Sequence, residues 1–189
     1  MKADSFKISK VFSGGGDIHY VLPYFQREYS WEESNWKILL EDAFAIYEEY
    51  QPEKELEHFL GSLVVINDGT INGVIPAFKL VDGQQRLTTI SLLFCALRNI
   101  ILKSNPVLAK KVQKMLINPD EEGDVYFKVL PTNKYGDREA YTTIIRGDKP
   151  PITESNIPKA YAYLYREVDK KIASDEIKPE QESLQIRQK

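Results

Sequence analysis

The sequence is poor in the residues that build disulfides, zinc sites and nuclease centres. Its 189 residues include one cysteine, Cys95, and two histidines, His19 and His58. A single cysteine cannot form a disulfide within the chain, and no clustered set of cysteine and histidine indicates structural zinc. A histidine-dependent nuclease needs a histidine base beside metal ligands, which two isolated histidines do not supply. We therefore expect no DNA cleavage by this chain, and we expect both histidines at the surface or at a strand edge.

Positive charge and long apolar runs are also limited. The 25 Lys and Arg residues face 28 Asp and Glu residues, so the net charge is −3, which argues against a uniformly basic DNA-binding surface. Helical surface lysines are usually only solvated, and we expect this of Lys103, Lys110, Lys111 and Lys114. No apolar stretch approaches the roughly 20 residues that cross a bilayer. These features predict a cytoplasmic protein without a membrane partner.

Hydrophobic periodicity divides the chain into short strands and amphipathic helices. Runs rich in β-formers predict strands over residues 6–12, 18–22, 59–66, 74–81 and 125–130. Helical spacing predicts helices over residues 31–50, 83–103, 106–117, 137–146 and 156–173. We expect the first two strands to form a hairpin, a turn at Asn67–Gly69, and a capping box between Ser30 and Glu33. Together these elements predict an α+β fold.

The most informative segment is Val81–Thr89, where a buried strand is expected to run into the longest helix. Such a junction directs free backbone N–H groups and a partial positive charge at one point, which favours a phosphate. Arg86 offers a planar fork of donors, and Gln84 and Gln85 can donate amide hydrogens or orient a water molecule. Asp82 can hold a metal ion, orient Arg86 or act as a base.

A structural role for the same segment is equally compatible with the residues. Asp82 at the N-cap and Gln85 at the N3 position would form a capping box that needs no ligand. The local sequence leaves both interpretations open.

A second Gln-Arg pair lies between a strand and the first long helix. Gln26 and Arg27 are bracketed by aromatic residues that can stack on a base, and Arg27 offers a second phosphate-binding fork. The alternative is an aromatic packing cluster in which Arg27 pairs with Glu28 or another carboxylate. If the pair binds a triphosphate, Gln26 and Arg27 should face the segment Asp82–Arg86 across one cleft.

Three segments, taken in order, resemble the N-terminal domain of GmrSD-type modification-dependent restriction endonucleases and related phage-defence proteins. They read Leu-Pro-Tyr-Phe-Gln-Arg-Glu-Tyr-Ser-Trp over residues 22–31, Phe-Leu-Gly-Ser over 59–62 and Val-Asp-Gly-Gln-Gln-Arg-Leu-Thr-Thr over 81–89. The resemblance spans about residues 5–102 and is weaker through Asp137–Arg146.

The resemblance implies a fold similar to ParB and sulfiredoxin, with a small mixed sheet packed with helices and then a helical extension. On this basis residues 1–103 form a nucleotide-binding domain and residues 104–177 a mostly helical extension of the same unit. Residues 178–189 are expected to be a tail or the start of a further domain. Because this tail is polar and closes no element, we expect the sequence to be a fragment.

The resemblance also implies that the chain binds and helps to hydrolyse a nucleoside triphosphate, and such sites usually employ Mg²⁺. Catalysis is then assigned to Asp82, Gln84, Gln85 and Arg86, with Asp82 as a candidate Mg²⁺ ligand. Nucleotide binding is assigned to Gln26, Arg27, Gly83, Ser62 and Thr88. In the family, hydrolysis is thought to license cleavage of modified DNA by a C-terminal HNH-like nuclease domain, so that domain and DNA are the partners expected of the full-length protein.

Two other functions remain open from the sequence. The chain can be a sensor that binds nucleotide or modified DNA without hydrolysis, or a DNA-binding domain that recognises a modified base through the aromatic residues near Tyr24 and Tyr29. An oligomer is compatible with each of these functions.

Overall fold

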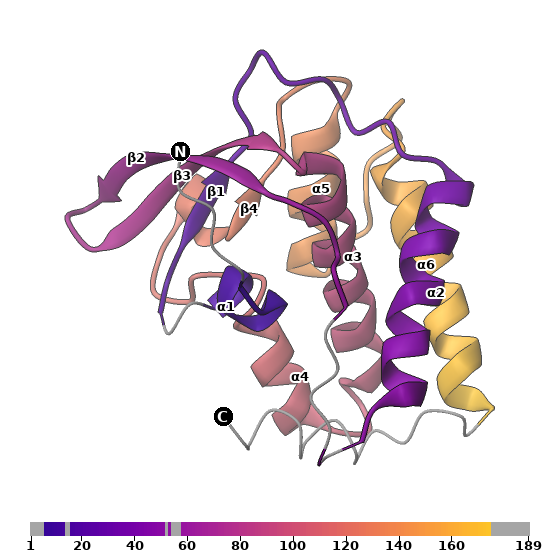
Figure 1. Ribbon diagram of the computed structural model, residues 1–189. Coiled ribbons are helices and arrows are strands. Elements are labelled where there is room, and N and C mark those ends of the chain that lie inside the picture. Colours follow the sequence, from indigo (N-terminus) through magenta and orange to yellow (C-terminus); the bar gives the residue numbers. More distant parts are fainter. Residues whose placement is uncertain (1–5, 14–15, 52, 54–57, 175–189) are drawn as a thin grey trace.

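A small mixed sheet forms one side of the molecule (Figure 1). The computed structural model describes residues 6–13, 16–51, 53 and 58–174. β1 is parallel to both β3 and β4, whereas β2 and β3 form an antiparallel hairpin. The sheet has the strand order β2-β3-β1-β4, with strands β1 (His19–Val21), β2 (Val64–Ile71), β3 (Ile75–Asp82) and β4 (Val129–Leu130). The predicted α+β class is confirmed, while the likeness to ParB and sulfiredoxin stays a prediction.

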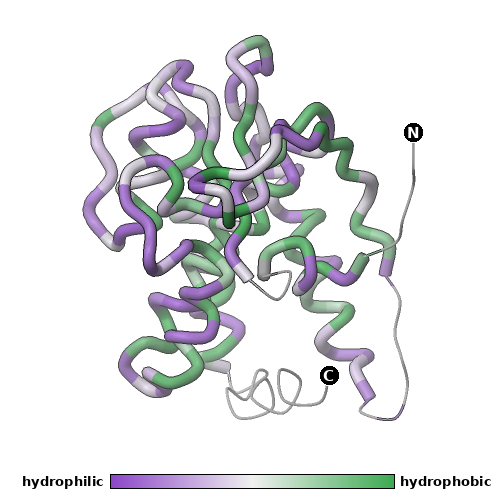
Figure 2. Tube along the Cα trace, turned by 90° about the vertical axis from the view of Figure 1, so that its left-hand side faces the viewer, coloured by the Kyte–Doolittle hydropathy of each residue, from purple (hydrophilic) through white to green (hydrophobic). Residues whose placement is uncertain are grey.

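Helices pack beside the sheet around one central helix. The described helices are α1 (Ile8–Ser13), α2 (Glu33–Glu49), α3 (Gln84–Ile101), α4 (Pro106–Gln113), the 3₁₀ helix η1 (Gly123–Tyr126), α5 (Asp137–Arg146) and α6 (Ile157–Ala173). α3 contacts α4, α5 and α6, and α2 packs on α6. Polar and apolar residues alternate along the helical turns in Figure 2, as expected where one face of each helix is buried. The long helices predicted over 31–50, 83–103, 137–146 and 156–173 are confirmed.

The first predicted strand is wrong, because residues 8–13 form helix α1. Ile8, Val11 and Phe12 have the i, i+3, i+4 spacing that places apolar side chains on one helical face. Phe12 is buried, and its ring lies 5.2 Å from that of Phe94 in an edge-to-face contact. Helical packing on α3 therefore replaces the predicted hairpin.

Several element boundaries and one helix cap also differ from the predictions. The strand predicted over 59–66 begins only at Val64, and the helix predicted over 106–117 ends at Gln113. β2 continues through Asn67–Gly69 with an irregular register, and the hairpin turns instead at Asn72 and Gly73, which both have positive φ. The last predicted strand is mostly the helix η1, with only Val129–Leu130 in the sheet. The capping box of α2 joins Glu32 and Asn35 rather than Ser30 and Glu33.

One hydrophobic core connects the elements before and after residue 103. It runs from Phe12 to Val168 and includes side chains of α3, α5 and α6. The predicted extension also supplies β4, which pairs with β1 inside the sheet. The expected tail at 178–189 lies outside the described residues. No helix in the described part of the chain is long and apolar enough to cross a membrane.

Candidate functional site

The turn from β3 into α3 is built by a glycine in the left-handed region. Gly83 has φ 86° and ψ 9° and occupies the N-cap of α3, with no side chain bonded to the helix end. A capping box by Asp82 and Gln85 is therefore not formed, and that structural interpretation is wrong. The first N–H groups of α3 have no acceptor within the helix, so they remain donors for a group in front of it.

A cleft of about 320 Å³ opens at this helix end. Its lining comes from the two predicted Gln-Arg segments together, namely Gln26, Arg27, Trp31, Val81, Asp82, Gly83, Gln84, Gln85 and Arg86. The expected juxtaposition of these segments across one cleft is thus observed. Ser62 and Thr88, which were also expected to bind nucleotide, are not among the residues that line it.

The Phe-Leu-Gly-Ser segment packs directly on the turn. Arg86 Nη1 donates to the backbone O of Ser62 at 3.1 Å. Gly61 has φ 100°, and a Cβ added there would lie 2.4 Å from Arg86 Cζ. At Gly83, an added Cβ would lie 2.4 Å from Leu63 Cδ2. Two glycines therefore allow the backbone to approach the turn closely, and Ser62 contributes its carbonyl rather than its hydroxyl.

Gln85 uses its amide to hold the opposite wall of the cleft. Its Oε1 accepts from the N–H groups of Ser30 at 2.9 Å and Trp31 at 3.3 Å. Its Nε2 donates to Glu28 O at 2.9 Å. These contacts give Gln85 a positioning role for Trp31.

Gln26 and Arg27 differ in how they are held. Gln26 Nε2 donates to Val81 O at 2.8 Å, and Gln26 O accepts from Lys134 Nζ at 2.8 Å. Arg27 is exposed and, within the described part of the chain, has neither an ion pair nor a hydrogen bond. The predicted alternative, a pair between Arg27 and Glu28, is not found. The Arg27 guanidinium is therefore available to an anion in the cleft.

A second space, of about 10 Å³ and near the size of one water molecule, adjoins the cleft and shares Arg27, Gln84 and Gln85 with its lining. Its lining is Leu22, Arg27, Tyr29, Gln84, Gln85, Thr88, Pro131, Thr132 and Asp137. Gln84 is only 6% exposed and lines both spaces. Its Oε1 has no hydrogen-bond partner among the described residues. A buried acceptor without a donor costs about 1–3 kcal/mol, so Gln84 is a polar group in need of a partner.

The aromatic residues of the second segment separate into buried and exposed ones. Tyr29 is in the core, its hydroxyl lies 2.6 Å from Thr89 Oγ1, and burial raises the pKa of the phenol. The burial of Tyr29 therefore leaves this ring out of the alternative in which aromatic residues near Tyr24 and Tyr29 recognise a modified base. Tyr24 and Phe25 are 81% and 74% exposed, and Trp31 lines the cleft itself. Tyr24 and Phe25 can therefore meet a base, although Lys134 Nζ already lies 5.3 Å from the centroid of the Tyr24 ring, and Trp31 packs partly against the core.

Sequence reasoning missed Asp137. Asp137 is the first residue of α5 and is 1% exposed. Its carboxylate accepts a hydrogen bond from Tyr29 N at 2.6 Å. Burial raises its pKa, an effect opposed by the hydrogen bonds from Ser155 and Tyr29. The one available signal was an aspartate in the first turn of a predicted helix, which is common at helix starts and does not reveal a contact 108 residues away.

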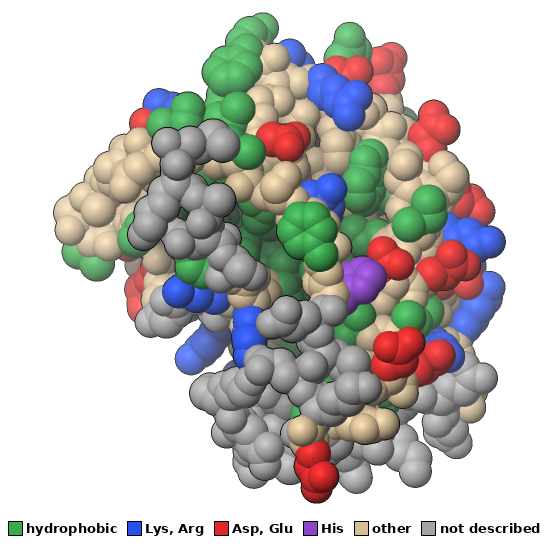
Figure 3. Space-filling view, in the orientation of Figure 1, with side chains coloured by type: hydrophobic (Ala, Val, Ile, Leu, Met, Phe, Trp, Pro, Cys, Tyr) green, Lys and Arg blue, Asp and Glu red, His purple; other side chains and the backbone are tan. Residues whose placement is uncertain are grey.

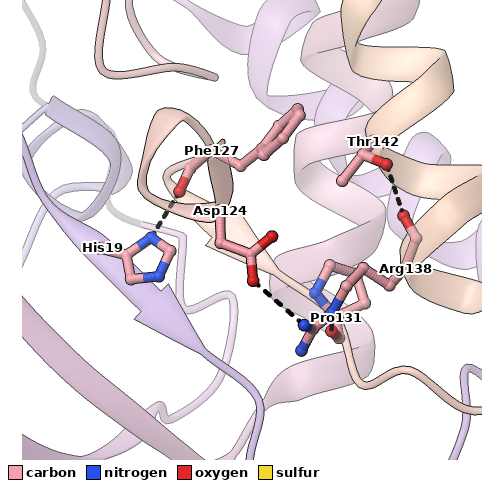
Figure 4. A network of polar contacts seen from close by, with 6 residues as sticks. All are labelled: His19, Asp124, Phe127, Pro131, Arg138 and Thr142. Atoms are coloured by element: carbon pink, nitrogen blue, oxygen red, sulfur yellow. Dashed lines mark hydrogen bonds and ion pairs between the residues drawn. The ribbon is translucent and has the colours of Figure 1, made fainter. Parts of the chain in front are cut away.

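Both histidines were expected at the surface or at a strand edge. This prediction is wrong for His19 and confirmed for His58. His19 lies in β1, between two other strands, and its Nδ1 is 2.7 Å from Phe127 O (Figure 4). It is 3% exposed, and burial lowers its pKa. His58 is exposed and lies 3.6 Å from Asp42.

Metal-ligating side chains are sparse throughout the residues that the structure describes, where no three His, Cys, Asp or Glu side chains form a group that could hold a metal ion. In the cleft, Asp82 is the one carboxylate among the lining residues. On the face shown in Figure 3, acidic and basic side chains are interspersed rather than gathered into a basic surface.

Comparison with known families gives one clear result. The model of the GmrSD restriction endonuclease N-terminal domain matches residues 8–189. No individually curated protein matches the chain. The match continues well beyond the span of about 5–102 over which the motifs alone carry the resemblance, and it includes the whole of α4, α5 and α6.

Proposed function

The chain belongs to the family of the GmrSD restriction endonuclease N-terminal domain, and we propose that its cleft binds a nucleoside triphosphate and so regulates a nuclease domain of the same restriction system. Membership gives the chain a DNA-related role in defence against phage. The observation that carries the nucleotide proposal is the unpaired Arg27 in the same cleft as Arg86 and the open N-terminus of α3.

The charges of the cleft favour a polyanion. Its lining holds two guanidinium groups, Arg27 and Arg86, against a single carboxylate, Asp82. The free N–H groups of α3 add a partial positive charge at the same place. Guanidinium groups bind phosphate oxygens in pairs of charge-assisted hydrogen bonds, so the three features together suit a chain of phosphates better than a neutral ligand.

The size and aromatic residues of the cleft favour a nucleotide over free phosphate. At about 320 Å³ the cleft lies at the lower end of the range for small-molecule sites, roughly 300–1,000 Å³. It can therefore hold the phosphates while the base reaches its rim. Trp31 in the lining and the exposed rings of Tyr24 and Phe25, which adjoin Gln26, offer surfaces on which a base can stack.

A magnesium ion fits this arrangement only together with the triphosphate. Mg²⁺ is commonly bound by one or two carboxylates plus substrate phosphates and water. Asp82 supplies one exposed carboxylate at the cleft, so it would hold the ion beside the phosphates. When bound, the ion would neutralise phosphate charge.

Hydrolysis is the further part of the proposal. Gln84 and Arg86 line the cleft at the helix end, where an amide can orient water and a guanidinium can stabilise charge on the transferred phosphoryl group. Gln85 supports this site by holding Trp31. Exclusion of water or completion of the site by the nuclease domain would raise a slow basal rate. DNA cleavage is assigned to that separate domain.

Calorimetric titration of the purified chain with ATP, GTP, CTP and UTP, each with and without Mg²⁺, tests the proposal. Arg27→Ala is expected to weaken binding by about 1.5–3 kcal/mol, the worth of charge-assisted hydrogen bonds. Arg166→Ala is the matched control, because it removes an exposed arginine on α6 that does not line the cleft. Absence of binding for all four triphosphates, or equal affinity in both variants, would contradict the proposal. Phosphate release under the same conditions separates hydrolysis from binding.

The exposure of Tyr24 and Phe25 favours a second candidate, a non-catalytic module that senses a modified base in DNA. This function predicts specific DNA binding without nucleotide and a steep loss of affinity on added salt. A double variant, Tyr24→Ala with Phe25→Ala, would then abolish DNA binding, whereas in a nucleotide-binding cleft it would weaken triphosphate binding by about 1–3 kcal/mol, the worth of base stacking, and leave the phosphate contacts of Arg27 and Arg86 in place.

A further inference from the structure

The cleft is lined by Gln26, Arg27 and Trp31 from one segment and by residues 81–86 from another, yet the first of these walls is held from a third region of the chain. Asp137, the first residue of α5, accepts from Tyr29 N at 2.6 Å through Oδ2. Its Oδ1 accepts from Ser155 Oγ at 2.5 Å. Ser155 Oγ in turn accepts from Ile157 N at 3.1 Å, in the first turn of α6. A buried chain of hydrogen bonds thus joins the start of α6 to the loop that carries Arg27.

A second contact joins the same two regions. Asn156 Nδ2, one residue before α6, donates to Trp31 O at 3.4 Å. The start of α6 therefore reaches the loop at Tyr29 and at Trp31, on either side of Ser30.

The bonds from Asp137 and Gln85 alternate along the loop backbone. Gln85 holds Glu28 O, Ser30 N and Trp31 N, while Asp137 holds the intervening Tyr29 N. Loss of Asp137 would leave a buried N–H without its charged acceptor in the middle of this run. The backbone would have to move to satisfy it, because an unmade buried hydrogen bond is costly.

Packing connects Asp137 to the cleft side chains as well. Asp137, Arg27 and Gln84 line the same space of about 10 Å³. A change at Asp137 therefore alters the surroundings of both cleft side chains.

Building on the proposed nucleotide function, we infer that Asp137 is a positioning residue for the cleft, and that it makes triphosphate affinity depend on the docking of α6. Asp137 does not line the cleft. It acts through the backbone of Tyr29, two residues after Arg27. By linkage, triphosphate binding and the docking of α6 stabilise each other.

Triphosphate titration of four variants tests this inference. Asp137→Ala should weaken binding about tenfold, as expected for one lost buried hydrogen bond. Asp137→Asn should rescue it to within about twofold, because the amide oxygen can still accept from Tyr29 N and the amide nitrogen can donate to Ser155 Oγ. Ser155→Ala should weaken binding less than Asp137→Ala, and it carries the test if Asp137→Ala does not fold.

Ile144→Val is the matched control, a buried change on α5 outside both hydrogen-bond routes. Wild-type affinity in folded Asp137→Ala, or an equal loss in Ile144→Val, would overturn the inference.

Amide hydrogen exchange at Tyr29, Ser30 and Trp31 provides a readout that needs no nucleotide. Exchange should accelerate about tenfold in Asp137→Ala, and much less in Asp137→Asn, because local opening follows the free energy of the bonds that close it. If the wild-type chain binds no triphosphate, the proposed function fails, and exchange alone then decides whether Asp137 positions the loop. Unchanged exchange in Asp137→Ala would overturn the positioning role.

Discussion

The two walls of the cleft reach their positions by different means. The wall at Asp82–Arg86 is a regular strand-to-helix junction, whose helix α3 is buried among α4, α5 and α6. The wall at Gln26–Trp31 has neither helix nor strand and is held by side chains from elsewhere, above all Gln85 and Asp137. One wall therefore depends on local backbone geometry and core packing, and the other on a few long-range hydrogen bonds.

The largest effect on the junction wall is expected from Gly83→Ala. The residue needs φ 86°, and the added Cβ would lie 2.4 Å from Leu63 Cδ2 and 2.9 Å from Ser62 O. Left-handed strain and overpacking together should lower the free energy of unfolding by about 3 kcal/mol. Urea unfolding followed by circular dichroism measures this loss.

Gly73→Ala serves as the control for that substitution. Gly73 also has positive φ, at 73°, but an added Cβ there meets nothing within 4 Å. It should cost only about 1 kcal/mol. Equal losses at the two positions would show that close packing on the turn contributes nothing.

The next largest effect is expected from Gln85→Ala, which releases the loop wall. Three backbone groups, at Glu28, Ser30 and Trp31, lose their partner, and we expect a loss of about 2 kcal/mol in unfolding free energy. Trp31 fluorescence, recorded in a Trp36→Phe background, should shift because its backbone anchor is gone. A loss of stability without any change at Trp31 would mean that Gln85 does not position that wall.

Much of the junction wall could be predicted from the sequence, because its signals are local. Helical spacing from Leu87 to Ile101 predicts α3, and the strand expected before it predicts a junction that directs free helix N–H groups at one point. The role of Gln85 could not be predicted. A glutamine at the third position of a helix is compatible with a capping box, and only the tertiary structure shows its amide directed at a loop 54 to 57 residues away.

The location of the loop wall could be predicted from the sequence, but the long-range hydrogen bonds that hold it could not. A Gln-Arg pair repeated in two segments favours one shared cleft, which the structure shows. The exposure of Tyr24 and the burial of Tyr29 could not be distinguished, since both are tyrosines in an aperiodic segment. Helix α1 was missed for a related reason, because its six residues satisfy both β-propensity and helical spacing.

A smaller difference is expected between the two arginines that face each other across the cleft. Arg86 donates to Ser62 O, whereas Arg27 has no partner among the described residues. Arg86→Ala should therefore cost about 1 kcal/mol in the absence of ligand. Arg27→Ala should stay within about 0.5 kcal/mol of the wild type. Thermal unfolding without nucleotide compares them, and a larger loss for Arg27→Ala would show that the loop wall depends on that guanidinium.

The smallest effect expected is a pH dependence carried by Asp137 in the loop wall. Burial raises the pKa of this carboxyl above its ordinary value of 3.8, so between that value and the raised one the folded protein binds more protons than the unfolded chain. Its contribution to stability must therefore fall as pH rises through this window and stay constant above it.

Burial lowers the pKa of His19, which makes stability rise with pH near 6.5, but that contribution is common to the wild type and to Asp137→Asn. The difference in unfolding free energy between the two proteins, measured by urea titration from pH 3.5 upward, isolates Asp137. As the Asp137 carboxyl ionises, this difference should change so that the asparagine variant becomes more stable relative to the wild type. A shift in favour of the wild type would show instead that the hydrogen bonds from Tyr29 and Ser155 outweigh the burial of the charge.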